Sequence, residues 1–300
     1  MTVTTEKAAR ATTPRPALSQ DDRRHRLAHG SRRFLLYVAL VVVGVLMVGP
    51  LYWLLSSSLK TAGDIRSFPP VWWPHKLEWG NYREAWQSAP FGNFFVNSLI
   101  TTFIGTTLEV LNAILTAYAF VFIRFPAKRF LFALLLAALM VPGHVTLLPS
   151  YLIVSELGWV NTYQGLIIPG AASAFGAFLL RQQMLTLPDE LIDAAKVDGA
   201  GHLRRLFKVV LPVSRPMVIT VTVVSLVSKW NDFIWPLVVT NTDSMRTLPI
   251  GLVMIKSSEG YVNWGAVMGA TVFVVLPVLI VFFIAQRYIV AGLTQGAVKG

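Results

Sequence analysis

The sequence predicts an all-α polytopic membrane protein with six transmembrane helices. Three observations support this prediction. The composition is 54% hydrophobic and only 14% charged, with a mean hydropathy of +0.59, which is typical of multi-spanning membrane proteins. Apolar runs of about 20 residues, the length that crosses a bilayer as a helix, recur along the chain. The segment 188–216 breaks this pattern with dense charge and helical periodicity.

The N-terminal segment 1–33 is polar, with eight Lys and Arg residues against three acids. We expect a disordered basic cytoplasmic tail here, followed by a membrane domain over residues 34–300. The first apolar run, 34–55, is too long for a signal peptide, and no small-residue cleavage site follows it. We therefore interpret it as a retained first span.

Five more spans follow by hydropathy, at 96–123, 130–154, 164–180, 217–240 and 264–286. The span at 164–180 is the shortest and is rich in Gly, Ala and Ser. Most of these spans contain proline, which removes a backbone donor and favours bent helices around a polar path. Six spans place both termini on the same side of the membrane.

The distribution of basic residues predicts which side that is. With Lys229 left out, 19 Lys and Arg residues lie in the termini and in the 2–3 and 4–5 connections, against 6 in the opposite loops. The positive-inside rule therefore places both termini and the segment 188–216 in the cytoplasm. The loop 56–95, with four Trp residues, would face outward, either as an interfacial anchor or as a docking surface for an extracytoplasmic partner.

The segment 188–216 reads as a helix–turn–helix. Pro188 suits the start of a helix, and Gly199 allows the chain to turn. The helix after the turn would be amphipathic, with Leu203, Leu206 and Phe207 on one face. The opposite face would carry Arg204, Arg205 and Lys208.

The fifth predicted span contains charged and aromatic residues that suggest a solute path. Lys229 and Asp232 are three residues apart, so they could pair along one helix face, and a charge at this depth is costly unless it is paired or wet. Trp230 and Trp235 offer flat surfaces on which a sugar ring could stack, and Asn231 adds a polar group. Glu109 and Asn112 in the second span form a weaker pair of the same kind.

Several functions are excluded by what the sequence lacks. The chain has no cysteine, and its five histidines are scattered, so we expect no disulfide, metal site or bound cofactor. It has no phosphate-binding loop and no dinucleotide fingerprint, so we expect no catalytic site, and any ATP hydrolysis must occur in a separate subunit. The net charge of +11 follows membrane topology and does not indicate nucleic acid.

The segment 188–216 resembles the EAA loop of permease subunits of ATP-binding-cassette importers. The matching positions are Asp193, Ala194, Ala195, Gly199, Val209, Leu211 and Pro212. Asp193 replaces the usual Glu and Val209 the usual Ile. Shorter stretches, among them 161–166, 230–233 and 292–300, resemble the maltose-permease-like, carbohydrate-uptake branch, and the resemblance covers residues 34–300.

This resemblance implies the type I ABC importer permease fold with a cytoplasmic coupling helix. It implies a multi-pass subunit of the cytoplasmic (inner) membrane, paired with a second, homologous permease as a heterodimer. An ABC ATPase dimer would bind the EAA loop, and an extracytoplasmic sugar-binding protein would deliver a mono- or oligosaccharide for translocation by alternating access. The coupling residues would be Asp193, Ala194, Ala195, Asp198, Gly199, Leu211 and Pro212.

Two alternatives remain from the sequence. The same importer family also carries other polar solutes, such as glycerol-phosphate. An ion-coupled secondary transporter would need no ATPase, but such proteins often contain internal repeats of spans, and no clear repeat is present in this chain.

Overall fold

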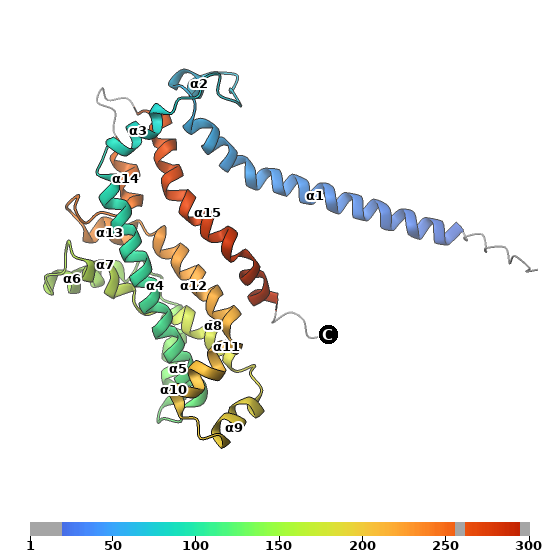
Figure 1. Cartoon of the computed structure of the whole chain (residues 1–300), viewed down its shortest axis with the longest axis vertical. Coiled ribbons are helices and arrows are strands. Elements are labelled where there is room, and N and C mark those ends of the chain that lie inside the picture. The colour runs from blue at the N-terminus through green and yellow to red at the C-terminus, as the bar shows by residue number, and fades with distance from the viewer. Residues whose placement is uncertain (1–19, 256–261, 295–300) are drawn as a thin grey trace, which may run out of the picture. The chain divides into compact units, whose positions relative to one another are not determined.

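The computed structural model describes residues 20–255 and 262–294, with side chains over 33–255 and 262–286, and these residues form helices and loops without a strand. The prediction of an all-helical membrane protein is confirmed (Figure 1). The α-helices are α1 (Gln20–Ser58), α2 (Ala62–Arg66), α3 (Gly80–Gln87), α4 (Phe91–Phe122), α5 (Lys128–Leu139), α6 (Leu147–Glu156), α7 (Tyr163–Ile167), α8 (Ala174–Met184), α9 (Asp189–Val197), α10 (His202–Arg205), α11 (Leu211–Val213), α12 (Arg215–Trp230), α13 (Ile234–Val239), α14 (Leu248–Met254) and α15 (Trp264–Thr294). A 3₁₀ turn, η1 (Ile168–Gly170), and a π turn, η2 (Leu206–Val210), complete them.

The chain divides into two units, residues 1–53 and 54–300. The described part of the first unit is helical throughout, because α1 begins at Gln20. The predicted irregular tail 1–33 therefore ends earlier than expected, and its residues 1–19 lie outside the described residues. The apolar part of α1, Arg33–Ser58, is long enough to span a membrane.

The second unit is organised along α4, a 32-residue helix about 48 Å long. Helices α8 and α12 pack against it, and α15 packs against α12 and α3. The two ends of α4 carry different parts of the chain: α3 and α14 lie near its beginning, whereas α9 and α10 lie near its end (Figure 1). The segment 188–216 and the described loop segments 56–95 and 241–255 therefore lie at opposite ends of this unit, as the predicted topology requires.

Of the three hydrophobic clusters among the described residues, two form the core at these two ends and the third packs α6, α7 and α13 around Val154, Ile167 and Val239. One joins the C-terminal half of α4 to α8, α9, η2 and α12, around Ile114, Leu180 and Val210. The other joins the beginning of α4 to α14 and α15, around Phe91, Leu248 and Ala270. Glu109, next to Val110 of the first cluster, and Lys229, next to Trp230 of the second, lie where the two clusters meet.

Several predicted spans are interrupted in the structure. Three unbroken helices are apolar and long enough to cross a membrane, and two bent pairs, Tyr163–Gly170 with Ala174–Met184 and His202–Val213 with Arg215–Trp230, raise the number to at most five among the described residues. The predicted span 130–154 is instead two short helices, α5 and α6, separated by a non-helical segment that contains Pro142. The predicted span 217–240 breaks at Asn231–Phe233. Six spans thus remain a prediction.

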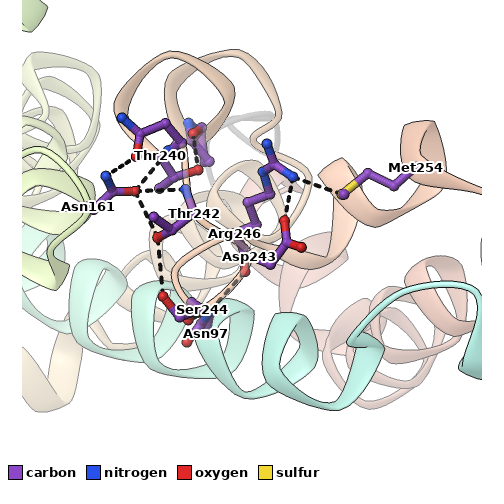
Figure 2. A network of polar contacts seen from close by, with 10 residues as sticks. Asn97, Asn161, Thr240, Thr242, Asp243, Ser244, Arg246 and Met254 are labelled. Carbon is purple, nitrogen blue, oxygen red and sulfur yellow. Dashed lines mark hydrogen bonds and ion pairs between the residues drawn. The ribbon is translucent and has the colours of Figure 1, made fainter.

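A network of polar contacts holds the loop 240–247 onto the rest of the unit (Figure 2). Buried Asn97 in α4 donates from Nδ2 to the backbone carbonyls of Ser244 and Arg246, at 2.8 and 2.9 Å, and accepts from the Tyr163 hydroxyl at 2.7 Å. Asn161 Oδ1 accepts from the backbone N–H groups of residues 241 and 242, at 2.8 and 3.1 Å. The loop is therefore fixed by side chains from two distant segments, which satisfy backbone groups that no helix satisfies.

We predict that Asn97→Ala destabilises the protein by about 2–3 kcal/mol, because it removes three hydrogen bonds worth about 1 kcal/mol each. The measurement is the unfolding midpoint of the purified protein in detergent. Asn112→Ala, on the exposed side of the same helix, is the matched control and should change stability by less than about 0.5 kcal/mol. Equal effects of the two substitutions would contradict the assigned role of Asn97.

Candidate functional site

The helix α9 and the turn after it form the first candidate site. Asp189 and Glu190 lie in the first turn of α9, where the helix dipole favours negative charge. After the helix, Gly199 adopts a φ of +72°, which a residue with a side chain rarely adopts. Its N–H bonds to the carbonyl of Lys196 at 3.0 Å, and the N–H of Ala200 bonds to that of Ala195 at 2.9 Å. This is the Schellman arrangement, so the predicted turn at this glycine is present.

The seven predicted coupling residues do not share one surface. Five are exposed, and these are Asp193, Ala194, Asp198, Gly199 and Pro212. Ala195 instead turns inward with Ile192 and fastens α9 to the bundle, and Leu211 packs partly against the core. Asp193 bonds to Lys196 at 2.7 Å on the exposed face. A partner that bound Asp193 would therefore compete with this ion pair.

The predicted faces of the second helix were wrong in part. Leu206 and Arg205 are buried, whereas Leu203 and Phe207 are exposed. The predicted faces assumed one regular α-helix, whereas α10 ends at Arg205 and the π turn η2, which places more residues in each turn than an α-helix, begins at Leu206. The exposed apolar residues here, together with two from α9, form what we term the coupling patch: Leu191, Val197, Leu203 and Phe207.

A hydrogen-bonded contact joins α4 to the segment 188–216, which we term the coupling segment after its predicted role. The hydroxyl of Tyr118 donates to the backbone carbonyl of His202 at 3.1 Å and lies 3.2 Å from its Nδ1. The two rings also meet edge to face, with centroids 6.0 Å apart. No pattern in the sequence indicates this contact, because its partners are 84 positions apart. It attaches the turn between α9 and α10 directly to the long central helix.

The second candidate site is an ion pair near the middle of α4. Lys229 Nζ lies 2.9 Å from Glu109 Oε2 and also donates to the carbonyl of Gly170 at 2.7 Å. The Ser225 hydroxyl bonds to the same Glu109 oxygen at 2.6 Å. The expected pair of Lys229 with Asp232 is thus replaced, because α12 ends at Trp230 and Asp232 lies beyond it, accepting from the N–H of Trp235.

The other predicted path residues take different positions. Trp230 is only 3% exposed, and its indole donates to the carbonyl of Val274, so it packs in the core and offers no stacking surface. Asn112 is exposed and lies within 3.4 Å of the Thr116 hydroxyl, apart from the ion pair. Asn231 is exposed at the end of α12. Lys229, Asp232 and Glu109 therefore remain as the path candidates that the structure brings near one another.

A cavity of about 370 Å³ opens beside this ion pair. Lys229 and Asp232 contribute the charges of its wall, and Trp235, one of the two tryptophans expected on the path, contributes an aromatic surface. The remaining lining includes Gly143 and Gly170 at breaks in the predicted spans, Ser150 within α6 and Gly105 within α4. These breaks leave helix ends and small residues around the cavity, which is how non-helical backbone is accommodated at membrane depth.

Comparison with known families settles the class of the protein. The family described as "Binding-protein-dependent transport system inner membrane component" matches residues 109–295, which include the ion pair, the coupling segment and α15. The chain belongs to this family. It is thus an inner-membrane permease component of a binding-protein-dependent ABC importer, a transport subunit rather than a catalytic one.

Curated relatives support the assignment along most of the permease. This chain is 34% identical over 264 residues to the sn-glycerol-3-phosphate transport system permease protein UgpE of Yersinia pestis, and the match covers 85% of this chain and 94% of that protein. It is 32% identical over 270 residues to the arabinooligosaccharides transport system permease protein AraQ of Halalkalibacterium halodurans, covering 89% and 96%.

Solved structures share the fold of the permease. A chain of a bacterial ABC transporter involved in the import of the acidic polysaccharide alginate superimposes with a TM-score of 0.76 at 22% identity, over 91% of this chain and 99% of that one. A chain of the alginate ABC transporter in complex with an alginate pentasaccharide-bound periplasmic protein gives a TM-score of 0.60 at 14% identity, over 90% and 96%.

We predict that a double-mutant cycle finds strong coupling between Glu109 and Lys229 and weak coupling between Lys229 and Asp232. Groups in one ion pair and hydrogen-bond network couple by about 0.5–3 kcal/mol, and we expect the upper half of this range for Glu109→Gln with Lys229→Met. The measurement is the unfolding free energy of the permease in detergent. A larger coupling in the cycle of Lys229→Met with Asp232→Asn would show that the sequence-based pairing was right.

Proposed function

We propose that this chain is one of two homologous permeases in an importer that carries a mono- or oligosaccharide across the cytoplasmic membrane by alternating access. A separate ATPase dimer would bind the coupling segment, and an extracytoplasmic binding protein would deliver the sugar. ATP binding would close the ATPase pair and move α9, and α4 would carry this movement to the cavity. The permease itself would bind no nucleotide.

The observation that carries this proposal is the exposed surface around α9. Val197 is 88% exposed, and with the rest of the coupling patch it gives this segment four large exposed apolar side chains among its acidic and basic residues. Large apolar side chains that stay exposed in one region are typical of protein–protein contacts. The α9 helix is also held against the core by Ile192 and Ala195, and the chain just after it is held by the Tyr118–His202 contact, so a force applied to α9 would reach α4.

The membrane topology of the proposal has both termini and α9 in the cytoplasm. The positive-inside count supports this orientation, since the basic residues gather in the segments that join the α9 end of the unit. In this topology α5 and α6 would together make the third of six spans. The Trp-rich loop 56–95 would then face the binding protein.

The proposed solute is a sugar because the cavity combines an aromatic surface with groups that bond to hydroxyls. Trp235 supplies the aromatic surface, and Lys229, Asp232 and Ser150 supply the groups that bond to hydroxyls. The names of the relatives support two classes, an oligosaccharide and glycerol-3-phosphate. Glycerol-3-phosphate stays the alternative solute. The relatives named for it support this class, and Lys229 is the cation that its phosphate would contact.

The direct test is isolation of the intact assembly from its native membrane in mild detergent. We expect an ATP-binding subunit, a second permease and a solute-binding protein to purify with this chain. We also expect the ATPase rate of the reconstituted assembly to rise when the binding protein is loaded with its sugar. Isolation of the chain without any nucleotide-binding protein would contradict the proposal, and stimulation by glycerol-3-phosphate alone would select the alternative solute.

We predict that Gly199→Val abolishes uptake while the protein still inserts into the membrane. A β-branched residue at a φ of +72° is strained by about 1–2 kcal/mol, which would distort the turn that follows α9. Gly201→Val is the matched control, because Gly201 has a φ of −67° that any residue adopts, and it lies two positions away in the same turn. The measurement is uptake of labelled sugar together with the amount of permease in the membrane. Equal uptake by the two variants would remove the Gly199 turn from the mechanism.

A further inference from the structure

The Lys229–Glu109 ion pair lies between two separate cavities. Lys229, but not Glu109, lines the cavity of about 370 Å³ described above, which we term the first cavity. Glu109, but not Lys229, lines a second cavity of about 230 Å³, together with Ser173, Val224 and Ser225. Each partner of the pair therefore lines one of the two spaces, and the ion pair lies between them.

Two glycines allow the lysine to lie in this position. A Cβ atom on Gly105 would come within 3.0 Å of the Lys229 Cδ, and one on Gly170 within 3.1 Å of its Nζ. The side chain thus runs close against the backbone of α4 and of η1, and any larger residue at either position would displace it. The lysine side chain fills the gap between three elements, which is what a partition between two cavities requires.

The ammonium and the carboxylate are almost enclosed, and each has other partners beside the ion pair. Their side chains are 19% and 15% exposed, and Gly170 and Ser225 bond to them from the two sides. The groups that face them come from all of the packed elements: Ser225 on α12, the Gly170 carbonyl on η1, and Asp232 in the wall of the first cavity. Charges at this depth stay paired, so the partition can open only if other polar groups replace the lost partner.

We propose that the Lys229–Glu109 pair separates the two cavities at rest, and that a hydroxyl-rich solute in the first cavity opens it by taking the place of Glu109 at the Lys229 ammonium. The sugar hydroxyls accept from the ammonium as the carboxylate did, and Asp232 keeps the lysine near a negative charge while it moves. Glu109 keeps its bond to Ser225 and then lines the path into the second cavity. This inference rests on the proposed function, since it places a solute path through these cavities.

Cysteine accessibility tests the partition cleanly, because the chain has no native cysteine. Ser150→Cys reports on the first cavity, and Val224→Cys, about one and a half turns from Lys229, reports on the second. The intact assembly, in sealed vesicles of each orientation, is treated with a charged, membrane-impermeant thiol reagent, and labelling of this chain is followed with time. With the pair intact, we expect the reagent to reach the two positions from opposite faces.

Breaking the pair should then connect the cavities. In the Lys229→Met background, the thiol reagent is added on the face from which Ser150→Cys is labelled. We expect it to label Val224→Cys at least tenfold faster than when the pair is intact. The labelling rate of Ser150→Cys should change less than twofold. Glu109→Gln should act in the same way with an almost unchanged side-chain shape, so it serves if Lys229→Met fails to assemble. Exchanging the charges, Lys229→Glu with Glu109→Lys, should restore at least part of the protection.

Two results would overturn the partition. One is labelling of Val224→Cys from the Ser150 face while the pair is intact, and the other is an unchanged rate in both single variants. Neither depends on ATP hydrolysis or uptake, so either result would leave the importer assignment standing. Isolation of the assembly without any ATPase would instead contradict the proposed function, and this inference would fail with it.

Discussion

A charged side chain inside a membrane span must be paired, and this constraint decides how the centre of the permease is arranged. Lys229 meets it by bonding to Glu109 on α4 and to the Gly170 carbonyl at a break in the chain. One ammonium thus ties α12, α4 and η1 together at the point where the two hydrophobic clusters meet. The break at Gly170 and the small residue at position 105 are necessary for this contact, because a regular helix with larger side chains would leave no room for the lysine.

Three polar side chains, spaced along the central helix α4, each hold a different part of the unit. Asn97 holds the loop 240–247, Glu109 holds Lys229, and Tyr118 holds the turn after α9. At about 1.5 Å per residue, these positions are about 18 and 14 Å apart along a single helix. A displacement of α9 would therefore be transmitted to the cavity along one rigid helix, because hydrogen bonds connect that helix to both regions. This route gives the proposed importer mechanism a structural basis within this one chain.

Local features of the fold were predictable from the sequence, and distant contacts were not. The helical class follows from hydropathy, and the turn at Gly199 follows from one glycine after a short amphipathic run, since both depend on neighbouring residues. The partner of Lys229 lies 120 positions away and could not be found by spacing along one helix. Trp230 was expected on a solute path and is buried, because hydropathy does not tell which side of a helix faces the core. The burial of Leu206 and the exposure of Phe207 were also missed, because the sequence pattern was read as one regular α-helix where the structure has the π turn η2.

The central claim is that α9 is the surface through which a separate ATPase moves this permease. Site-specific photo-crosslinking in intact membranes tests it most directly, with the photoreactive residue placed at Asp193 on the exposed face of α9 and, as a control, at Trp72 in the opposite loop. We predict a crosslink from position 193 to a nucleotide-binding protein and none to that protein from position 72. A crosslink to the nucleotide-binding protein from position 72 but not from position 193 would contradict the account.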